Sequence, residues 1–219
     1  MESNSLNEIE SALLNRVKEI ATADDPAHDF LHFKRVVKLA KNLCSLENAK
    51  LEVVLPAAWL HDFVIVPKSD PRRSQASRLS AQAAIQFLSE LGYPEIYFGP
   101  IAHAIEAHSF SANITPETIE ARIVQDADRL DGLGAMGIAR CFATASLMKT
   151  PFYSEVDPFC SARACDDRSF AVDHFFAKLF VVAESLTTDA GRAEGVKRTR
   201  VMKQFLNDLG DEIQGDEIF

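Results

Sequence analysis

Apolar residues recur at intervals of three and four along almost the whole chain, and this helical period limits the possible folds more than any other feature. Few segments alternate between apolar and polar residues in the way that a half-buried strand does. We therefore expect an all-α protein whose amphipathic helices pack into a bundle-like domain. Helices are expected at about 6–20, 30–46, 51–64, 75–91, 116–148, 170–187 and 190–209. A further helix is expected to include residues 101–105.

Prolines and glycines predict where these helices begin and break. Proline lacks an amide donor and is tolerated in the first turn of a helix, so Pro56 favours a helix that begins near Val53. Thr115-Pro116 resembles a cap followed by proline at the first helical position. Glycines within 132–137 predict a bent or broken helix. Residues 149–169 are predicted to form a long irregular connection, of the kind that often serves as a lid or substrate loop.

The length and the charge of the chain limit its domain organisation and its partners. A chain of 219 residues with 47% hydrophobic content can bury one substantial core, so we expect a single domain over residues 1–219, closed by the helices within 170–209. The net charge of −9 argues against nucleic acid or an anionic membrane as a partner. No apolar run approaches the roughly 20 residues that cross a bilayer, and no signal-peptide core is visible, so a soluble, cytoplasmic protein is expected.

The cysteines do not indicate a disulfide framework or a zinc knuckle, because no CxxC pair occurs. Only the last two are close in sequence. We interpret all of them as buried or incidental thiols: Cys44, Cys141, Cys160 and Cys165.

Histidines and aspartates occupy positions that the helical period turns toward the interior. His32 lies on the apolar stripe of its helix, His61 and Asp62 extend two adjoining stripes of the next one, and Asp128 follows an apolar stripe of a third. Burial of an unpaired aspartate is costly, and a shared cation offsets that cost. The sequence therefore predicts one divalent metal ion held by these four residues. Their imidazoles and carboxylates suit Mn²⁺, Mg²⁺, Fe²⁺, Co²⁺ or Zn²⁺ without selecting one.

Each of these residues also has a plainer interpretation. A single histidine on an apolar face, such as His32, is often a hydrogen-bonded core residue rather than a ligand. Asp128 can instead cap a kinked helix or pair with Arg129 or Arg35. The conjunction of these residues with the His61-Asp62 doublet favours the metal site.

Three short blocks carry a resemblance to a known family: HFKRVV at 32–37, AWLHD at 58–62 and DADRLD at 126–131. In this order they resemble the motifs of the HD superfamily, which is named for its His-Asp doublet. The resemblance covers about residues 28–145 and implies a mostly helical fold, phosphohydrolase activity and the same four metal ligands. The segments HDFLH, PKSDPRRS, AIEAHSFS and IVQDADRLDGLGAMGIARCF further resemble a bacterial group of small HD hydrolases, some of which are nucleotide pyrophosphohydrolases.

Other histidines near these blocks are candidates for the substrate cleft. His28 and Asp29 form a second doublet, in which Asp29 can serve simply as a helix N-cap while His28 lines the cleft. His103 and His108 are five residues apart and diverge by about 140° on one regular helix, so they cannot both reach one metal without a break. Both are candidates for contact with substrate or water.

A basic cluster lies shortly after the His-Asp doublet and consists of Lys68, Arg72 and Arg73. Guanidinium groups bind phosphate oxygens in pairs and stabilise charge that develops in phosphoryl transfer. We therefore predict that this cluster binds the substrate phosphates. The alternative is a solvated loop.

These predictions together describe a metal-dependent phosphohydrolase for a small phosphorylated metabolite, with a nucleotide as the favoured substrate. Water activated by the cation would attack phosphorus and cleave a pyrophosphate linkage or a monoester. Asp131, Glu106 or a cleft histidine would orient or deprotonate that water. The alternative is a noncatalytic regulatory module that binds metal and nucleotide without turnover. Hydrolysis of cyclic nucleotides or nucleic-acid ends is disfavoured, because the chain is acidic.

Overall fold

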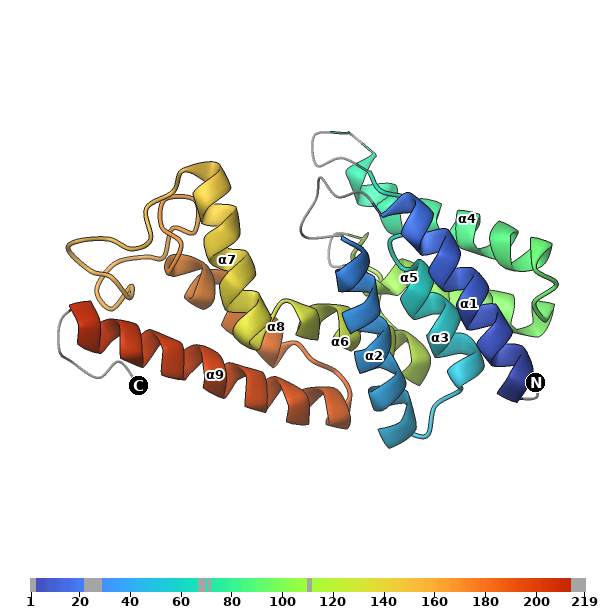
Figure 1. The fold of residues 1–219 in the computed structure, drawn as a ribbon. Helices are drawn as coiled ribbons and strands as arrows, with labels where there is room; N and C mark the ends of the chain where they lie inside the picture. The colour runs from blue at the N-terminus through green and yellow to red at the C-terminus, as the bar shows by residue number, and fades with distance from the viewer. Residues whose placement is uncertain (1–2, 22–28, 67–69, 71, 110–111, 214–219) are drawn as a thin grey trace. The chain divides into compact units, whose positions relative to one another are not determined.

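The computed structural model describes residues 3–21, 29–66, 70, 72–109 and 112–213. Helices make up all of the regular secondary structure in these residues, and no strand occurs among them (Figure 1). The predicted all-α class is therefore confirmed. Within the same residues, no helix is both long enough and apolar enough to cross a membrane.

The chain divides into two compact units, which are described separately. Unit 1 comprises Met1–Asp128 and Thr187–Ala190, and unit 2 comprises Arg129–Leu186 and Gly191–Phe219. The expected single domain over residues 1–219 stays a prediction.

Unit 1 is arranged around α3 (Leu51–Leu60), whose residues from Val53 to Leu60 are all buried. A helix that is apolar on every side must be covered on every side. The helices in contact with α3 are α1 (Ser3–Ile20), α2 (Phe30–Leu46), α4 (Ala76–Glu90) and α5 (Phe98–His108), and α4 also packs on α5 (Figure 1). Short 3-10 turns, η1 (Arg73–Gln75) and η2 (Glu95–Tyr97), precede α4 and α5.

The start of α2 follows from its N-cap. The Asp29 carboxylate accepts a hydrogen bond of 2.7 Å from the backbone N–H of His32 and so satisfies one of the amides that the first turn leaves unpaired. This confirms the predicted capping role of Asp29. The cap also fixes His32 in the first turn, where its side chain is buried as the apolar stripe predicted.

The prediction that the third helix begins near Val53 is wrong, because α3 begins at Leu51 and contains Pro56 in its interior. Proline at this position cannot donate to the carbonyl oxygen of Glu52, four residues earlier. The Tyr93 hydroxyl donates to that oxygen instead, at 2.7 Å. A partner distant in sequence thus replaces the missing helical hydrogen bond.

The prediction that Pro116 is the first helical residue is also wrong, since α6 spans Ile119–Asp131. Thr118, rather than Thr115, caps this helix: its hydroxyl oxygen accepts a hydrogen bond of 3.2 Å from the backbone N–H of Ala121.

The predicted break near the glycines is confirmed, because α6 ends at Asp131 and α7 (Gly134–Met148) follows. Gly134 has a φ of 69°, which favours glycine. A Cβ atom on Gly137 would clash with the carbonyl oxygen of Gly132, so the tight connection between α6 and α7 requires glycine at position 137.

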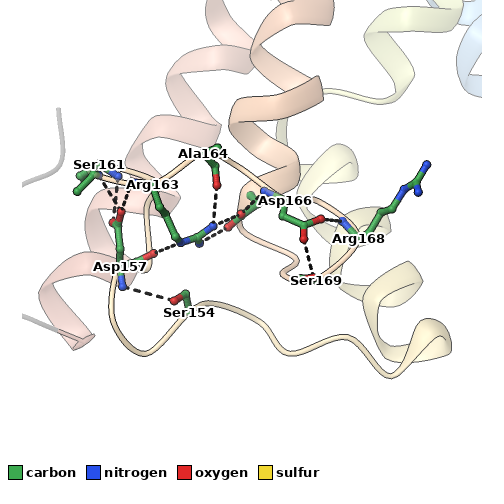
Figure 2. Close-up of polar contacts among 10 residues, drawn as sticks. Ser154, Asp157, Ser161, Arg163, Ala164, Asp166, Arg168 and Ser169 are labelled. Carbon is green, nitrogen blue, oxygen red and sulfur yellow. Dashed lines mark hydrogen bonds and ion pairs between the residues drawn. The ribbon is translucent and has the colours of Figure 1, made fainter.

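Unit 2 contains α7, a π-helix η4 (Phe175–Leu179), α8 (Phe180–Glu184) and most of α9 (Asp189–Ile213). The helix expected at 170–187 is therefore shorter, and it contains π geometry over Phe175–Leu179. In the core of unit 2, the rings of Phe142, Phe175 and Phe205 pack at centroid distances between 5.6 and 6.3 Å. Residues 149–169 are irregular, as predicted, and Figure 2 shows the polar contacts within this loop. A role as a lid stays a prediction.

Candidate metal centre

Four elements of unit 1 bring imidazole and carboxylate groups to one place. His32 comes from the first turn of α2, and His61 and Asp62 directly follow α3. His108 is the last residue of α5, and Asp128 lies near the end of α6. These five side chains form two groups that share His61 and in which all ligand atoms lie within 4.8 Å of one another.

The first group joins His32, His61 and Asp128. The Nε2 atoms of the two imidazoles are 3.2 Å apart. Oδ1 of Asp128 lies 3.6 Å from Nε2 of His32 and 3.8 Å from Nε2 of His61. The two histidines are buried, whereas the Asp128 side chain is 30% exposed, so the group is open to solvent on the carboxylate side.

The second group joins His61, Asp62 and His108. Oδ2 of Asp62 lies 3.7 Å from Nε2 of His61, and Oδ1 lies 3.5 Å from Nε2 of His108. His103 points elsewhere, since its Nε2 accepts a hydrogen bond of 3.0 Å from the backbone N–H of Glu117. The two histidines of α5 therefore diverge, as their spacing predicted.

His108, predicted only as a candidate for contact with substrate or water, lies in the cluster itself, and its apolar spacing was a sequence signal for this position. His108 continues the buried stripe of Ile101, Ala104 and Ile105 on α5. The same apolar spacing places His32 on the buried stripe of α2.

Backbone carbonyls orient two of the imidazoles. Nδ1 of His61 lies 2.9 Å from the carbonyl oxygen of Ala58, and Nδ1 of His108 lies 2.6 Å from that of Ile105. A carbonyl oxygen only accepts, so in each neutral ring Nδ1 carries the proton and Nε2 presents a lone pair to the cluster. This second hydrogen bond is typical of metal-binding histidines.

The surroundings shift the pKa values of these two imidazoles in opposite directions. Burial lowers the pKa of His61 from 6.5 to about 4 and outweighs the opposing charges of Asp62 and Asp128. Burial also opposes protonation of His108, but its hydrogen bond to Asp62 and the two carboxylate charges prevail and raise its pKa. The His61 imidazole is therefore uncharged at neutral pH.

The donor set fits a divalent cation. Ligand atoms about 2.1 Å from a cation and roughly 90–110° apart are separated by about 3.0–3.4 Å. The edges of the His32–His61–Asp128 triangle, 3.2 to 3.8 Å, are close to this range. Asp62 and His108 supply further donors beside the shared His61. A cation held by nitrogen and oxygen donors, without thiolates, is of the kind that binds substrate oxygen atoms and water.

The remaining predicted site residues have varied surroundings. The carboxylate of Asp131 belongs to unit 2, where it is buried and pairs with Arg140 at 3.3 Å. Glu106 is half-buried on α5. His28 and Lys68 lie outside the described residues.

The arginines of the basic cluster are engaged within their own loop. Arg72 donates to both carboxylate oxygens of Asp70, at 3.1 and 2.8 Å, and this pairing lowers the pKa of Asp70 to about 2. Arg73 donates to the carbonyl oxygen of Val66 at 2.8 Å. The position of Asp70, two residues before Arg72, was a sequence signal for this ion pair.

Asp126 is an important polar residue of unit 1 to which the sequence analysis gave no role. Its buried carboxylate accepts hydrogen bonds from the backbone N–H and the hydroxyl group of both Thr187 and Thr188, at 2.7 to 3.2 Å. These contacts attach residues 187–190 to α6. The point of attachment, Asp126, lies two positions before Asp128. No local pattern links Asp126 to threonines that lie 61 and 62 residues later.

Comparison with known proteins decides the family. The HD-domain family model matches residues 30–133, which include His32, His61, Asp62 and Asp128. The chain is also 32% identical over 203 residues to the YpgQ protein of Bacillus subtilis (strain 168), a match that covers 91% of each chain. This protein belongs to the HD superfamily.

Solved structures agree with this assignment. A crystal structure of YpgQ in complex with ADP is 31% identical to this HD protein, with a TM-score of 0.73 over 94% of this chain and 95% of YpgQ. A HD-superfamily hydrolase from Bacillus thuringiensis is 30% identical, with a TM-score of 0.76 over 96% of this chain and 99% of the other. The Lin1889 protein from Listeria innocua is 26% identical, with a TM-score of 0.73 over 96% and 98% of the two chains. The protein thus has the fold of HD-superfamily hydrolases, and the expected resemblance is confirmed.

Proposed function

We propose that this protein is a metal-dependent phosphohydrolase that cleaves a phosphoanhydride or phosphomonoester bond of a nucleotide. The observation that carries the proposal is the convergence of donor atoms from His32, His61 and Asp128 at 3.2 to 3.8 Å, beside Asp62. The hydrolase fold of its relatives supports the reaction class. The complex of YpgQ with ADP supports a nucleotide as the ligand.

The proposed roles of the cluster follow from its chemistry. When bound, one divalent cation would polarise a phosphate oxygen and lower the pKa of a water molecule. His32, His61, Asp62 and Asp128 would hold it. The low pKa of His61 keeps this ligand neutral, and the two carboxylates supply the negative charge that a divalent ion requires.

Among the candidates for orienting or deprotonating the attacking water, His108 has the strongest geometric support. Its Nε2 lies 3.5 Å from Asp62, and its raised pKa lets it hold a proton next to the cluster. His103 already accepts a hydrogen bond from Glu117, and Asp131 pairs with Arg140. Glu106 stays a further candidate.

The basic cluster of Lys68, Arg72 and Arg73, with His28, is proposed to neutralise the substrate phosphates. Arg72 is exposed and held by Asp70, so a phosphate would have to exchange with that carboxylate. Such an exchange is chemically reasonable, because guanidinium forks bind both anions in the same bidentate geometry.

The test is hydrolysis of nucleoside mono-, di- and triphosphates by metal-free protein to which single divalent metals are added back. Pyrophosphate and orthophosphate are measured separately, because they identify the bond that breaks. We expect metal-dependent release of one product, which Asp62→Ala abolishes. The exposed Asp208 on α9 provides the matched control, Asp208→Ala, which should retain activity. Tight nucleotide binding without product across all metals would reject the enzyme and favour the noncatalytic regulatory module.

A further inference from the structure

The turn that carries the His-Asp doublet is held by a side chain from another helix. After α3 ends, the carbonyl oxygen of Leu60 accepts a hydrogen bond of 3.2 Å from the backbone N–H of Phe63, three residues later, so the chain has left the α-helix. The backbone N–H of Val64 donates to the hydroxyl oxygen of Ser80 at 3.0 Å. The same hydroxyl donates a longer hydrogen bond, of 3.5 Å, to the carbonyl oxygen of Val64. Ser80 thus pairs both backbone groups of one residue.

Ser80 is fully buried on α4. This helix packs on α3, which ends directly before the doublet, and on α5, which ends in His108. A buried hydroxyl group that loses its partner costs free energy, so the contact with Val64 is worth keeping in the folded state. Ser80 therefore ties the turn after the doublet to a helix that is itself fixed against both neighbouring helices.

The turn held in this way carries Asp62, which lies two residues before Val64. The carboxylate oxygens of Asp62 are 3.7 Å from Nε2 of His61 and 3.5 Å from Nε2 of His108. The turn is held on its N-terminal side by α3 and on its C-terminal side by Ser80. Ligand groups bind a metal well only when they stay within about 0.5 Å of their working positions, so both anchors bear on the position of Asp62.

We propose that Ser80 is a positioning residue of the metal centre, whose hydroxyl group fixes the turn from which Asp62 reaches the cation. The inference rests on the metal centre of the proposed function. Replacing a residue that orients a metal ligand typically weakens metal binding by roughly 10–100-fold. Because Ser80 acts through the backbone and not on a ligand atom, loss of its hydroxyl group should weaken binding by about tenfold, the lower end of this range.

The same helix offers a matched control in Ser77, three residues before Ser80. Both serines are buried, but the hydroxyl oxygen of Ser77 has no hydrogen-bond partner among the residues that the structure describes. Replacing either serine by alanine removes one oxygen atom from the interior side of α4. Only Ser80→Ala takes a hydrogen-bond partner away from the turn that carries the doublet.

The test measures the dissociation constant of Mn²⁺ for the metal-free full chain, with electron paramagnetic resonance counting the free ion. Circular dichroism and the fluorescence of the buried Trp59 first establish that each variant is folded. We expect Ser80→Ala to raise the dissociation constant about tenfold and Ser77→Ala to leave it unchanged. If Ser80→Ala does not fold, Ser80→Cys replaces it, because a thiol is a weaker hydrogen-bonding group of similar shape, and its dissociation constant should also rise.

The outcomes separate a positioning role from a structural one. A folded Ser80 variant that is less stable in denaturant but binds Mn²⁺ as tightly as wild type overturns the proposal. An equal loss of affinity in Ser77→Ala also overturns it. The expected loss confined to Ser80 supports the inference even if no nucleotide is hydrolysed, so failure of the enzymatic proposal is recognised separately. A wild-type protein that binds no Mn²⁺ overturns both.

Discussion

Replacing Asp126 by alanine should destabilise unit 1 without removing any proposed metal ligand. The carboxylate is fully buried and accepts from four donors of Thr187 and Thr188. Thr187 is half-buried, so its donors can turn to water, but Thr188 is only 2% exposed. The two Thr188 donors would therefore lose their carboxylate acceptor in a place that water reaches poorly.

The expected magnitude follows from these two donors. A buried donor that loses its partner costs about 1–3 kcal/mol, so the pair gives a loss of about 4 kcal/mol in the free energy of unfolding. For a chain of this size each kcal/mol lowers the melting temperature by about 2–4 °C, which predicts a fall of roughly 8–16 °C. Asp126→Asn keeps one acceptor oxygen and should lose about half as much.

Denaturant unfolding of the metal-free protein can measure this loss. The single tryptophan, Trp59, is buried in α3, so its fluorescence reports on unit 1. Asp128→Ala is the matched control on the same helix: its side chain is 30% exposed, and its removal should change stability by less than about 1 kcal/mol. An Asp126→Ala protein within about 0.5 kcal/mol of wild type would refute the reasoning.

Three further predictions concern protonation, the loop and the proposed reaction. The pKa of His61 falls from 6.5 to about 4 on folding, so the unfolded chain binds more protons between these values, and about 3 kcal/mol of stability present above pH 6.5 is lost as the pH falls toward 4. The raised pKa of His108 changes the free energy of unfolding with pH in the opposite direction, so the contribution of His61 is isolated by comparing wild type with His61→Gln. The free energy of unfolding of each protein is measured as a function of pH. Identical pH profiles would contradict the prediction. Arg163→Ala leaves the buried Asp173 carboxylate without its ion pair and should destabilise unit 2. Limited proteolysis should then cleave residues 149–172 faster than in wild type, and an unchanged rate of cleavage would disprove the prediction. Under the proposed function, His108→Ala should lower kcat at least tenfold while His103→Ala changes it little, and equal effects in a steady-state assay would remove His108 from its proposed role.

Features set by neighbours in sequence could be predicted. The Asp29 cap and the inward direction of His32 depend on one helix turn, and the break between α6 and α7 depends on local glycines. The HD motifs identified the family because His32, the His61-Asp62 doublet and Asp128 each lie within a short block of consecutive residues. Of the two histidines on α5, apolar spacing contained enough information to select His108.

Features set by distant partners could not be predicted. Pro56 is accommodated inside α3 because the Tyr93 hydroxyl donates a hydrogen bond to the Glu52 carbonyl oxygen, which proline cannot pair. No sequence pattern around Pro56 reveals that Tyr93 is this partner. Asp126 lies in the quoted DADRLD block, yet its partners are threonines from a later connection. Periodicity gives the face on which a residue lies but does not identify the residue opposite it.

The most direct test of the metal centre is a crystal structure of the protein grown with Mn²⁺, with anomalous diffraction recorded to locate the ion. The structure predicts one anomalous peak within about 2.0–2.4 Å of Nε2 of His32 and of His61, with oxygen atoms of Asp62 and Asp128 completing the ligands. A fully loaded crystal with no peak among these residues, or with the ion bound only elsewhere, would contradict the account.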